Sequence, residues 1–398
     1  MLLVILLFAL SIQFSVCGKS NPEEGMTVPE IITYHGYPAE EHFITTQDGY
    51  ILGVHRIAGG KGASVKASDK PRPVIYLQHG LLCSSADWVV NPVNDSLAFM
   101  LADAGFDVWM GNSRGNTYSL SHQSLSVKSD EYWQFSWDEM AQHDIPATLD
   151  HIEKVTKQPQ VYYVGHSQGT MVAFAGFSAN QTLAKRIKTF FALAPVAYLG
   201  SMQSPIKYLA QFAPEIKWLF KILGVRDFMP QSWILEWLAS HMCTLSFGES
   251  VCANVVFVIC GYDPPQMNKT RLDVYMTHSP AGTSVQNMLH YAQGYQSKRF
   301  QKYDFGKEEN KKKYGQSIPP EYDLSSFAVP TVLYSGGQDW LADPSDVEIL
   351  ERKIPKQSII KKVNIPPWMH LDFIWGVDAS RMVYKHIVDS ARVMEKVD

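Results

Sequence analysis

The sequence is short of the features that mark nucleic-acid-binding, repeat and membrane-spanning proteins. It contains no internal repeat, no basic cluster interleaved with aromatic residues, and no stretch after the N-terminus that is apolar for long enough to cross a bilayer. A net charge of −4 and an isoelectric point near 6.4 give no reason to expect a nucleic-acid partner. Three lysines at 311–313 stand beside Glu308 and Glu309, and we interpret this run as a solvated loop.

The apolar stretch at the N-terminus is too short to be a membrane span. Residues 2–14 are apolar and are followed by the small residues Ser15, Cys17 and Gly18. This arrangement is typical of a signal peptide, with a membrane anchor as the alternative. We therefore predict that residues 1–18 are a signal peptide, and that the mature protein follows the secretory pathway.

Cysteine is scarce, and four cysteines would remain after removal of the signal: Cys83, Cys243, Cys252 and Cys260. Four cysteines in a secreted chain allow up to two disulfides, and the sequence alone does not fix the pairing. Cys243 and Cys252 are the closest candidates for closing a short loop. Their spacing lacks a matching pair of histidines, which argues against a zinc site, so we predict no metal.

Three Asn-X-Ser/Thr sequons are present, and they agree with passage through the secretory pathway. Their asparagines are Asn94, Asn180 and Asn268. We predict them as candidate N-glycosylation sites, because such a sequon in a secreted chain is an acceptor for N-linked glycans.

Strand-like and helix-like patterns alternate through two parts of the chain. The expected strands are 42–46, 50–57, 73–78, 106–110, 161–164, 187–194, 330–335 and 358–365, and the expected helices include 97–104, 137–155, 170–177, 343–353 and 379–394. The first two strands flank an Asp-Gly turn and predict a β-hairpin. Further along, the alternation predicts a mostly parallel central sheet with helices on both faces.

The alternation stops after about residue 199 and resumes after about residue 317. Within this interval, residues 204–241 are helix-like and unusually apolar. Such a segment is either ordinary core or a mobile cap whose apolar face covers a site and opens onto lipid. We predict one α/β core in two parts, 19–199 and 318–398, divided by a cap and lid insertion at 200–317.

The pentapeptide Gly165-His166-Ser167-Gln168-Gly169 joins an apolar strand-like run to a helix-compatible run. A strand, a tight turn bearing serine and then a helix form the context that a Gly-x-Ser-x-Gly nucleophile elbow requires. Gly165 and Gly169 are expected in such a turn, because a side chain at either position would collide with the neighbouring strand or helix. The pattern predicts Ser167 as a nucleophile.

Ser167 needs a base, since a free hydroxyl is a poor nucleophile. His166 is adjacent to Ser167 in the sequence. We reject it as the base, because neighbouring side chains on an elbow point away from each other. His370 follows the last expected strand, at the edge of the sheet where α/β proteins bind ligands. The acid of such a triad lies between serine and histidine in the chain. We predict Asp339, which directly follows a strand, over Asp343, which starts a helix and is better explained as its cap.

The oxyanion of a tetrahedral intermediate needs two hydrogen-bond donors. One is expected to be the backbone N–H of Gln168, the residue after the nucleophile. The other should come from the loop after the 73–78 strand, where His79-Gly80-Leu81 stands, and we assign it to the N–H of Leu81. Each donor would contribute roughly 3 kcal/mol to transition-state stabilisation.

These motifs resemble the acid lipase family, which includes gastric lipase and lysosomal acid lipase. The matching stretches are 34–57, 77–82, 97–117, 164–170, 271–275, 280–287, 339–344 and 370–375. The resemblance implies an α/β-hydrolase fold with a helical cap and lid, and a triad of Ser167, Asp339 and His370. Residues 217–242, expected to form the lid, match the family poorly, which leaves the substrate preference open.

The resemblance also implies a Cys243–Cys252 disulfide, with Cys260 unpaired. It implies a lipase that hydrolyses triacylglycerols or cholesteryl esters at an emulsion or membrane surface, with no cofactor and no obligate protein partner. Two alternatives are a soluble carboxylesterase without interfacial activation and a catalytically silent lipid-binding protein. The apolar segment argues against the first, and the retention of all three triad candidates argues against the second.

Overall fold

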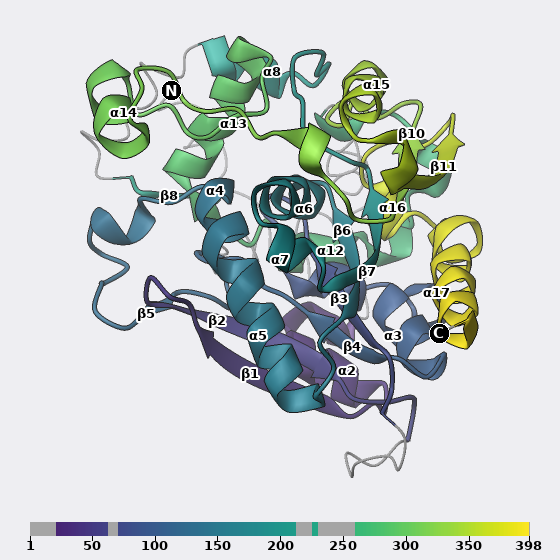
Figure 1. The fold of residues 1–398 in the computed structure, drawn as a ribbon. Coiled ribbons are helices and arrows are strands. Elements are labelled where there is room, and N and C mark those ends of the chain that lie inside the picture. The colour runs from purple at the N-terminus through teal and green to yellow at the C-terminus, as the bar shows by residue number, and fades with distance from the viewer. Residues whose placement is uncertain (1–20, 63–70, 212–224, 230–258, 398) are drawn as a thin grey trace, which may run out of the picture.

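The structure is a computed structural model of the chain and describes residues 21–62, 71–211, 225–229 and 259–397. Within these residues a nine-stranded sheet has the order β1-β2-β4-β3-β6-β7-β10-β11, with β5 paired to β2 (Figure 1). Its strands are β1 (Ala39–Thr45), β2 (Tyr50–Ile57), β3 (Val74–Gln78), β4 (Asp107–Met110), β5 (Ser121–His122), β6 (Val161–His166), β7 (Ile187–Leu193), β10 (Thr331–Gly336) and β11 (Ile359–Ile365). A separate pair is formed by β8 (Asp227–Phe228) and β9 (Thr283–Ser284).

Most of the large sheet is parallel. Neighbouring strands from β4 to β11 run in the same direction, whereas β1, β2 and β5 pair antiparallel. All residues of β3, β4 and β6 are buried, so both faces of the sheet centre are covered. The predicted α/β class, with a mostly parallel sheet between helices, is confirmed.

The described helices are α2 (Val28–Tyr34), α3 (Leu97–Asp103), α4 (Trp137–Glu139), α5 (Ile145–Thr156), α6 (Gln168–Ala179), α7 (Gln181–Ala184), α8 (Ile206–Gln211), α12 (Leu272–His278), α13 (Val285–Ser297), α14 (Lys307–Tyr314), α15 (Pro344–Lys353), α16 (Asp372–Trp375) and α17 (Lys385–Val397). Helices connect the parallel strands as crossovers, for example α3 between β3 and β4 and α15 between β10 and β11, and further helices precede, interrupt and follow the sheet. In Figure 1, α5 and α6 lie in front of the sheet, and the C-terminal helix α17 lies near α3. Arg392 on α17 donates to the carbonyl of Ala104, just after α3.

Two expectations about helices need correction. The lysines at 311–313 lie in α14 and not in a loop. Pairs between Glu308 and Lys311, and between Glu309 and Lys312, join successive turns, and the acids precede the bases as the helix dipole favours.

The helix expected at 137–155 is interrupted by a π-helical turn at Met140–Asp144. Pro146 follows this turn and lacks the N–H that a regular α-helix would use there.

Several predictions lie outside the described residues. They are the signal peptide at 1–18, the Cys243–Cys252 disulfide and most of the lid at 217–242. The division of the chain into core, cap and core likewise stays a prediction.

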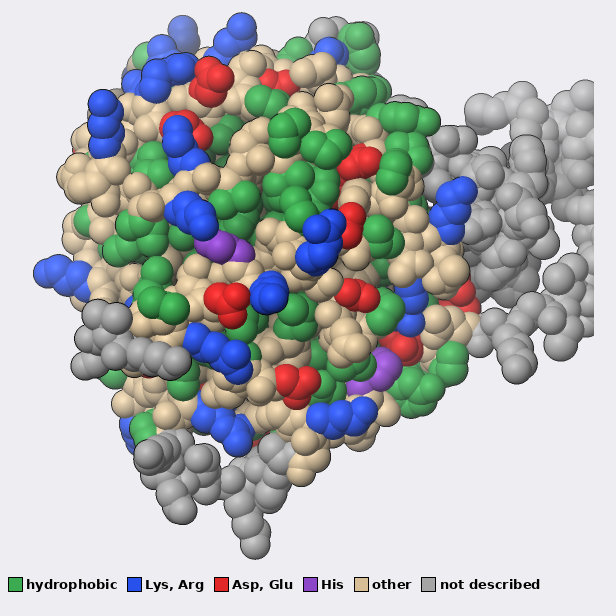
Figure 2. Space-filling model, turned by 90° about the vertical axis from the view of Figure 1, so that its right-hand side faces the viewer, with side chains coloured by type: hydrophobic (Ala, Val, Ile, Leu, Met, Phe, Trp, Pro, Cys, Tyr) green, Lys and Arg blue, Asp and Glu red, His purple; other side chains and the backbone are tan. Residues whose placement is uncertain are grey.

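The described surface is mixed in charge. On the face drawn in Figure 2, Lys and Arg side chains are interspersed with Asp and Glu side chains, in keeping with a net charge of −4. Over the described ranges, no helix has the length and apolar character that a bilayer crossing needs.

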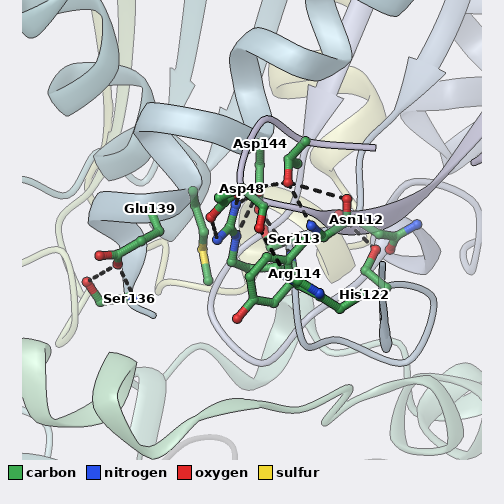
Figure 3. Close-up of polar contacts among 12 residues, drawn as sticks. Asp48, Asn112, Ser113, Arg114, His122, Ser136, Glu139 and Asp144 are labelled. Carbon is green, nitrogen blue, oxygen red and sulfur yellow. Dashed lines mark hydrogen bonds and ion pairs between the residues drawn. The ribbon is translucent and has the colours of Figure 1, made fainter. Parts of the chain in front are cut away.

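A buried arginine ties three parts of the fold together (Figure 3). Arg114 lies in the loop after β4 and is almost fully buried. Its guanidinium donates to Asp48, in the turn between β1 and β2, at 2.6 and 3.0 Å, and to Asp144, just before α5, at 2.8 Å. The same group lies 4.0 Å from the centre of the Tyr50 ring.

The arginine also sets the charge of its partners. Burial acts to raise the pKa of Asp48, but the guanidinium of Arg114 outweighs it and lowers this pKa to about 2. For Asp144, burial dominates and raises the pKa, although Arg114 opposes the rise. The cluster therefore depends on the arginine as the buried cation that balances the buried Asp144 and the partly exposed Asp48.

Replacing Arg114 by Met should lower the free energy of unfolding by about 3–5 kcal/mol, because it leaves the buried Asp144 without its cation. Urea unfolding at pH 7 measures this change. As a matched control, Arg352→Met removes an exposed i,i+4 pair with Glu348 and should change stability by less than about 0.5 kcal/mol. Equal effects of the two substitutions would contradict the account.

Candidate active site

Ser167 occupies a strained turn between β6 and α6. Its backbone has φ 52° and ψ −116°, in the left-handed half of φ space that a side chain disfavours. Hydrogen bonds hold the turn on both sides: the Ser167 N–H donates to the Leu193 carbonyl at 3.0 Å, and the Ser167 carbonyl accepts from the Thr170 N–H at 2.9 Å and its hydroxyl at 2.6 Å. The sharp turn raises the serine side chain at the carboxyl edge of the sheet.

The two elbow glycines allow this turn because the backbones around them nearly touch. A Cβ atom on Gly169 would lie 2.3 Å from the carbonyl oxygen of Gln78, at the end of β3. A Cβ atom on Gly165 would lie 2.8 Å from the carbonyl group of Gly169, in the first turn of α6. The steric reason predicted for these two glycines therefore agrees with the geometry.

Three side chains that are distant in the sequence meet at this edge. The Ser167 Oγ lies 2.7 Å from Nε2 of His370, and Nδ1 of His370 lies 2.8 Å from Oδ2 of Asp339. Ser167, His370 and Asp339 are 8%, 3% and 1% exposed. Since a carboxylate can only accept, Nδ1 of His370 carries the hydrogen, which leaves Nε2 free to accept from the serine hydroxyl.

The carboxylate of Asp339 is itself fixed in orientation. Its Oδ1 accepts from the N–H groups of Leu341 and Ala342, at 2.9 and 2.8 Å. The competing acid, Asp343, caps α15 by accepting from the Ser345 N–H at 2.8 Å. The other oxygen of Asp343 accepts from the Gln203 side chain. The structure thus brings Asp339 to His370 and gives Asp343 the capping contact that the sequence suggested.

His166 has a role that the sequence did not reveal. Its Nε2 lies 3.0 Å from the carbonyl oxygen of His370 and donates to it. Burial, with a smaller effect from the neighbouring His370, lowers the pKa of His166 well below its usual range, so the ring stays neutral. His166 therefore links β6 to the backbone of His370. The contact spans two segments far apart in the chain, and we find no local sequence signal for it.

His79 orients the loop that follows β3. Its Nε2 accepts from the Ser113 N–H at 3.0 Å, so its Nδ1 carries the hydrogen and donates to the Gly80 carbonyl at 2.7 Å. Burial lowers the pKa of His79 to about 4, so the ring stays neutral near pH 7. The bond fixes the peptide plane between Gly80 and Leu81, because the Gly80 carbonyl and the Leu81 N–H belong to the same rigid amide.

Both predicted oxyanion donors are available for a ligand. Neither the Leu81 N–H nor the Gln168 N–H donates to any group in the described part of the chain. A Cβ atom on Gly80 would lie 3.2 Å from the Cβ of Ser167, so this loop packs directly against the serine. The Gln168 side chain is held from α13, where Asn287 donates to its Oε1 at 2.8 Å and Tyr291 at 3.1 Å.

The remaining predicted residues are dispersed over the molecule. Asn94 and Asn180 are exposed and Asn268 is half-buried. Cys83 and Cys260 are buried free thiols. Among the residues that the structure describes, no three His, Cys, Asp or Glu side chains are grouped so as to hold a metal ion.

Sequence comparison places the chain among known lipases. A model of the partial alpha/beta-hydrolase lipase region matches residues 28–92, and a model of the alpha/beta hydrolase fold matches residues 73–377. The chain is 51% identical to the lysosomal acid lipase/cholesteryl ester hydrolase of Homo sapiens, over 94% of this chain and 92% of that protein. It is 48% identical to the gastric triacylglycerol lipase of Homo sapiens, over 94% and 93% of the two chains.

A solved thioesterase domain from the curacin biosynthetic pathway has the same fold. It superposes with a TM-score of 0.51 at 17% identity, over 88% of this chain and 99% of that one. Taken with the two human relatives, this fold and the serine elbow identify the class: the chain belongs to the acid lipase family of α/β hydrolases. The resemblance drawn from the motifs is confirmed.

Replacing Gly169 by Ala should lower the free energy of unfolding by about 3 kcal/mol or more, because α6 must move away from β3 to admit the methyl group. Thermal or urea unfolding measures this loss. Gly25→Ala is the control, since a Cβ atom there meets nothing within 4 Å. A Gly169→Ala protein as stable as the control would contradict the close approach.

Proposed function

We propose that this protein is a lipase that hydrolyses ester bonds of neutral lipids, triacylglycerols or cholesteryl esters, through a covalent acyl-enzyme. The observation that carries the proposal is the continuous hydrogen-bonded chain from Ser167 through His370 to Asp339, with contacts of 2.7 and 2.8 Å. About half of the residues are identical to those of a lysosomal acid lipase/cholesteryl ester hydrolase and of a gastric triacylglycerol lipase, over nearly the full chain. This similarity supports the substrate class.

In the first half-reaction, Nε2 of His370 accepts the proton of the Ser167 hydroxyl as Oγ attacks the ester carbonyl. The carbonyl oxygen becomes an oxyanion, which the N–H groups of Leu81 and Gln168 stabilise. His370 then returns the proton to the leaving alcohol, a diacylglycerol or a sterol, and the acyl group stays on Ser167. Asp339 stabilises the imidazolium that forms in each transfer and keeps its ring in one orientation.

In the second half-reaction, water takes the place of the alcohol. His370 removes a proton from the water as it attacks the acyl-enzyme, and the oxyanion forms again in the same position. The proton passes to Ser167 Oγ as the acyl bond breaks, which releases a fatty acid and restores the free enzyme. One water molecule is consumed for each ester bond cleaved.

We also propose that the protein is secreted or lysosomal, with residues 1–18 removed as a signal peptide. The apolar pattern at 2–14 and the three sequons support this proposal. The side chain of Asn180 caps α7 by accepting from the Leu183 N–H through Oδ1, which leaves its Nδ2 for a glycan. Cys243 and Cys252 are proposed as a disulfide, and residues 200–317 as a cap and lid that meets the lipid surface.

Replacing Ser167 by Ala should abolish hydrolysis, with a loss of about 10⁴-fold or more in kcat, and should leave the fold intact. Turnover of emulsified triolein at matched protein concentration measures this loss. Ser178→Ala, in α6, is the control, because among the described residues its hydroxyl hydrogen-bonds only to the Ala175 carbonyl. Wild-type turnover by Ser167→Ala would overturn the proposal.

The substrate class is tested with the wild-type protein on three esters: emulsified triolein, emulsified cholesteryl oleate and a soluble butyrate ester. A lipase should be activated severalfold when substrate exceeds its solubility and forms an interface. Hyperbolic kinetics on the butyrate ester, with no turnover of either emulsion, would instead identify a soluble carboxylesterase. Absence of turnover on all three esters would favour a silent lipid-binding protein.

A further inference from the structure

A short segment of the chain, 260–263, holds the loops of the acid and the base together. The carbonyl oxygen of Cys260 accepts from the N–H of Trp340 and from the N–H of His370, both at 3.3 Å. A Cβ atom on Gly261 would lie 2.1 Å from the Gln338 carbonyl oxygen and 2.9 Å from the Met369 Cβ. The segment therefore lies between the loop that carries Asp339 and the loop that carries His370.

Two carboxyl groups meet where this segment touches the His370 loop. Asp263 ends the segment and is 7% exposed, and Asp372 follows His370 by two residues and is 1% exposed. The two carboxyl groups lie within hydrogen-bonding reach of each other. Ionised carboxylates can only accept, so a hydrogen bond between them requires one proton held by the pair.

The other contacts of the pair agree with a shared proton. Oδ2 of Asp372 accepts from the Met369 N–H at 2.6 Å. Oδ2 of Asp263 is buried and receives no hydrogen from any other described residue, and buried oxygens of this kind normally have a donor. A proton held between the two carboxyls supplies it.

Among the described residues, the ionisable groups that face the pair are mainly acids, and the nearby cation Arg381 is paired with Asp378 at 3.1 Å. Asp339 acts on Asp372 from the loop after β10, and Asp378 acts on Asp263 from the turn before α17. Asp87 lies on the short turn Ser85–Trp88 that packs against α16, where burial raises its pKa to about 7. The Cys260 thiol, whose pKa burial also raises, is a further described group that acts on Asp372. Loss of the shared proton would leave two adjacent buried anions among further acids.

We propose that Asp263 and Asp372 are positioning residues that share one proton, and that their carboxyl–carboxylate hydrogen bond holds the His370 loop in register with Ser167. In alkaline solution the proton passes to water, the two carboxylates repel, and the loop loosens. This inference rests on the proposed role of His370 as the base.

The direction of the pH effect follows from the raised pKa. Burial raises the pKa of Asp372 to about 9, with further contributions from Asp263 and Asp339, whereas an aspartate in an unfolded chain has a pKa of about 3.9. Between these two values the native protein holds a proton that the unfolded chain has lost. Stability linked to the pair is therefore complete below about pH 4 and declines as pH rises toward about 9.

The decisive variant is Asp263→Asn, because an amide can donate to the Asp372 carboxylate without a titrating proton. Between about pH 5 and 8, the unfolding equilibrium constant of the wild type should increase about tenfold per pH unit relative to the variant. In addition, the fall in kcat on a soluble butyrate ester at alkaline pH should begin at least about one pH unit higher in the variant, with KM unchanged. We call the pH at which kcat begins to fall the alkaline limit. A general structural role of the pair would not move this limit.

Asp378→Asn is the matched control, because it removes a nearby acid without removing the shared proton. Its alkaline limit should stay within about 0.3 pH units of the wild type, since Asp378 is partly exposed and screened. An unchanged alkaline limit in Asp263→Asn would overturn the proposal, as would parallel stability profiles of variant and wild type.

Asp372→Asn provides a second test, since its amide can accept from Met369 and donate to Asp263. It should reproduce the shifted alkaline limit of Asp263→Asn. Failure of both variants to fold at any pH would contradict the proposal, because either amide preserves the hydrogen bond. If stability follows the predicted pH dependence but the wild type hydrolyses no ester, the proposed function fails and the proton-sharing pair stands.

Discussion

The close approach of helix α6 to strand β3 is the constraint on which the rest of the site depends. Because Gly169 has no side chain, the helix begins against the Gln78 carbonyl, 2.3 Å from where a Cβ atom would lie. Ser167 must then adopt a positive φ, and its hydroxyl rises at the carboxyl edge of the sheet. The loops after β10 and β11 begin at this edge as well, since parallel strands share their carboxyl ends. The sheet thus brings Asp339 and His370 to the serine.

Neutral buried histidines keep the peptide groups around the serine in place. His79 donates to the Gly80 carbonyl, and His166 donates to the His370 carbonyl. Burial lowers the pKa of both rings, so each keeps one nitrogen with a hydrogen and one without. A charged ring in either position would have to donate from both nitrogens, and Nε2 of His79 faces another donor, the Ser113 N–H. Both hydrogen bonds therefore persist at pH values below the usual pKa of histidine.

Much of this arrangement could be predicted from the sequence, because the deciding signals are local. Alternating strand and helix patterns indicated the parallel sheet, and the position of Asp339 directly after a strand separated it from Asp343 at a helix start. Contacts between distant segments had no such signal, and the bond from His166 to the His370 carbonyl is one example. The lysines at 311–313 lie in α14 and not in the expected loop, because their pairing with acids one turn earlier favours a helix.

The most direct test of the central claim is covalent labelling of the wild-type protein with a long-chain alkyl phosphonate, followed by mass spectrometry of the peptides. A phosphonate reacts with a serine only where a base and an oxyanion site activate it. The account predicts one phosphonate per chain, on Ser167, with ester hydrolysis lost in proportion to labelling. Labelling of another residue with full loss of activity, or complete labelling of Ser167 with activity retained, would contradict it.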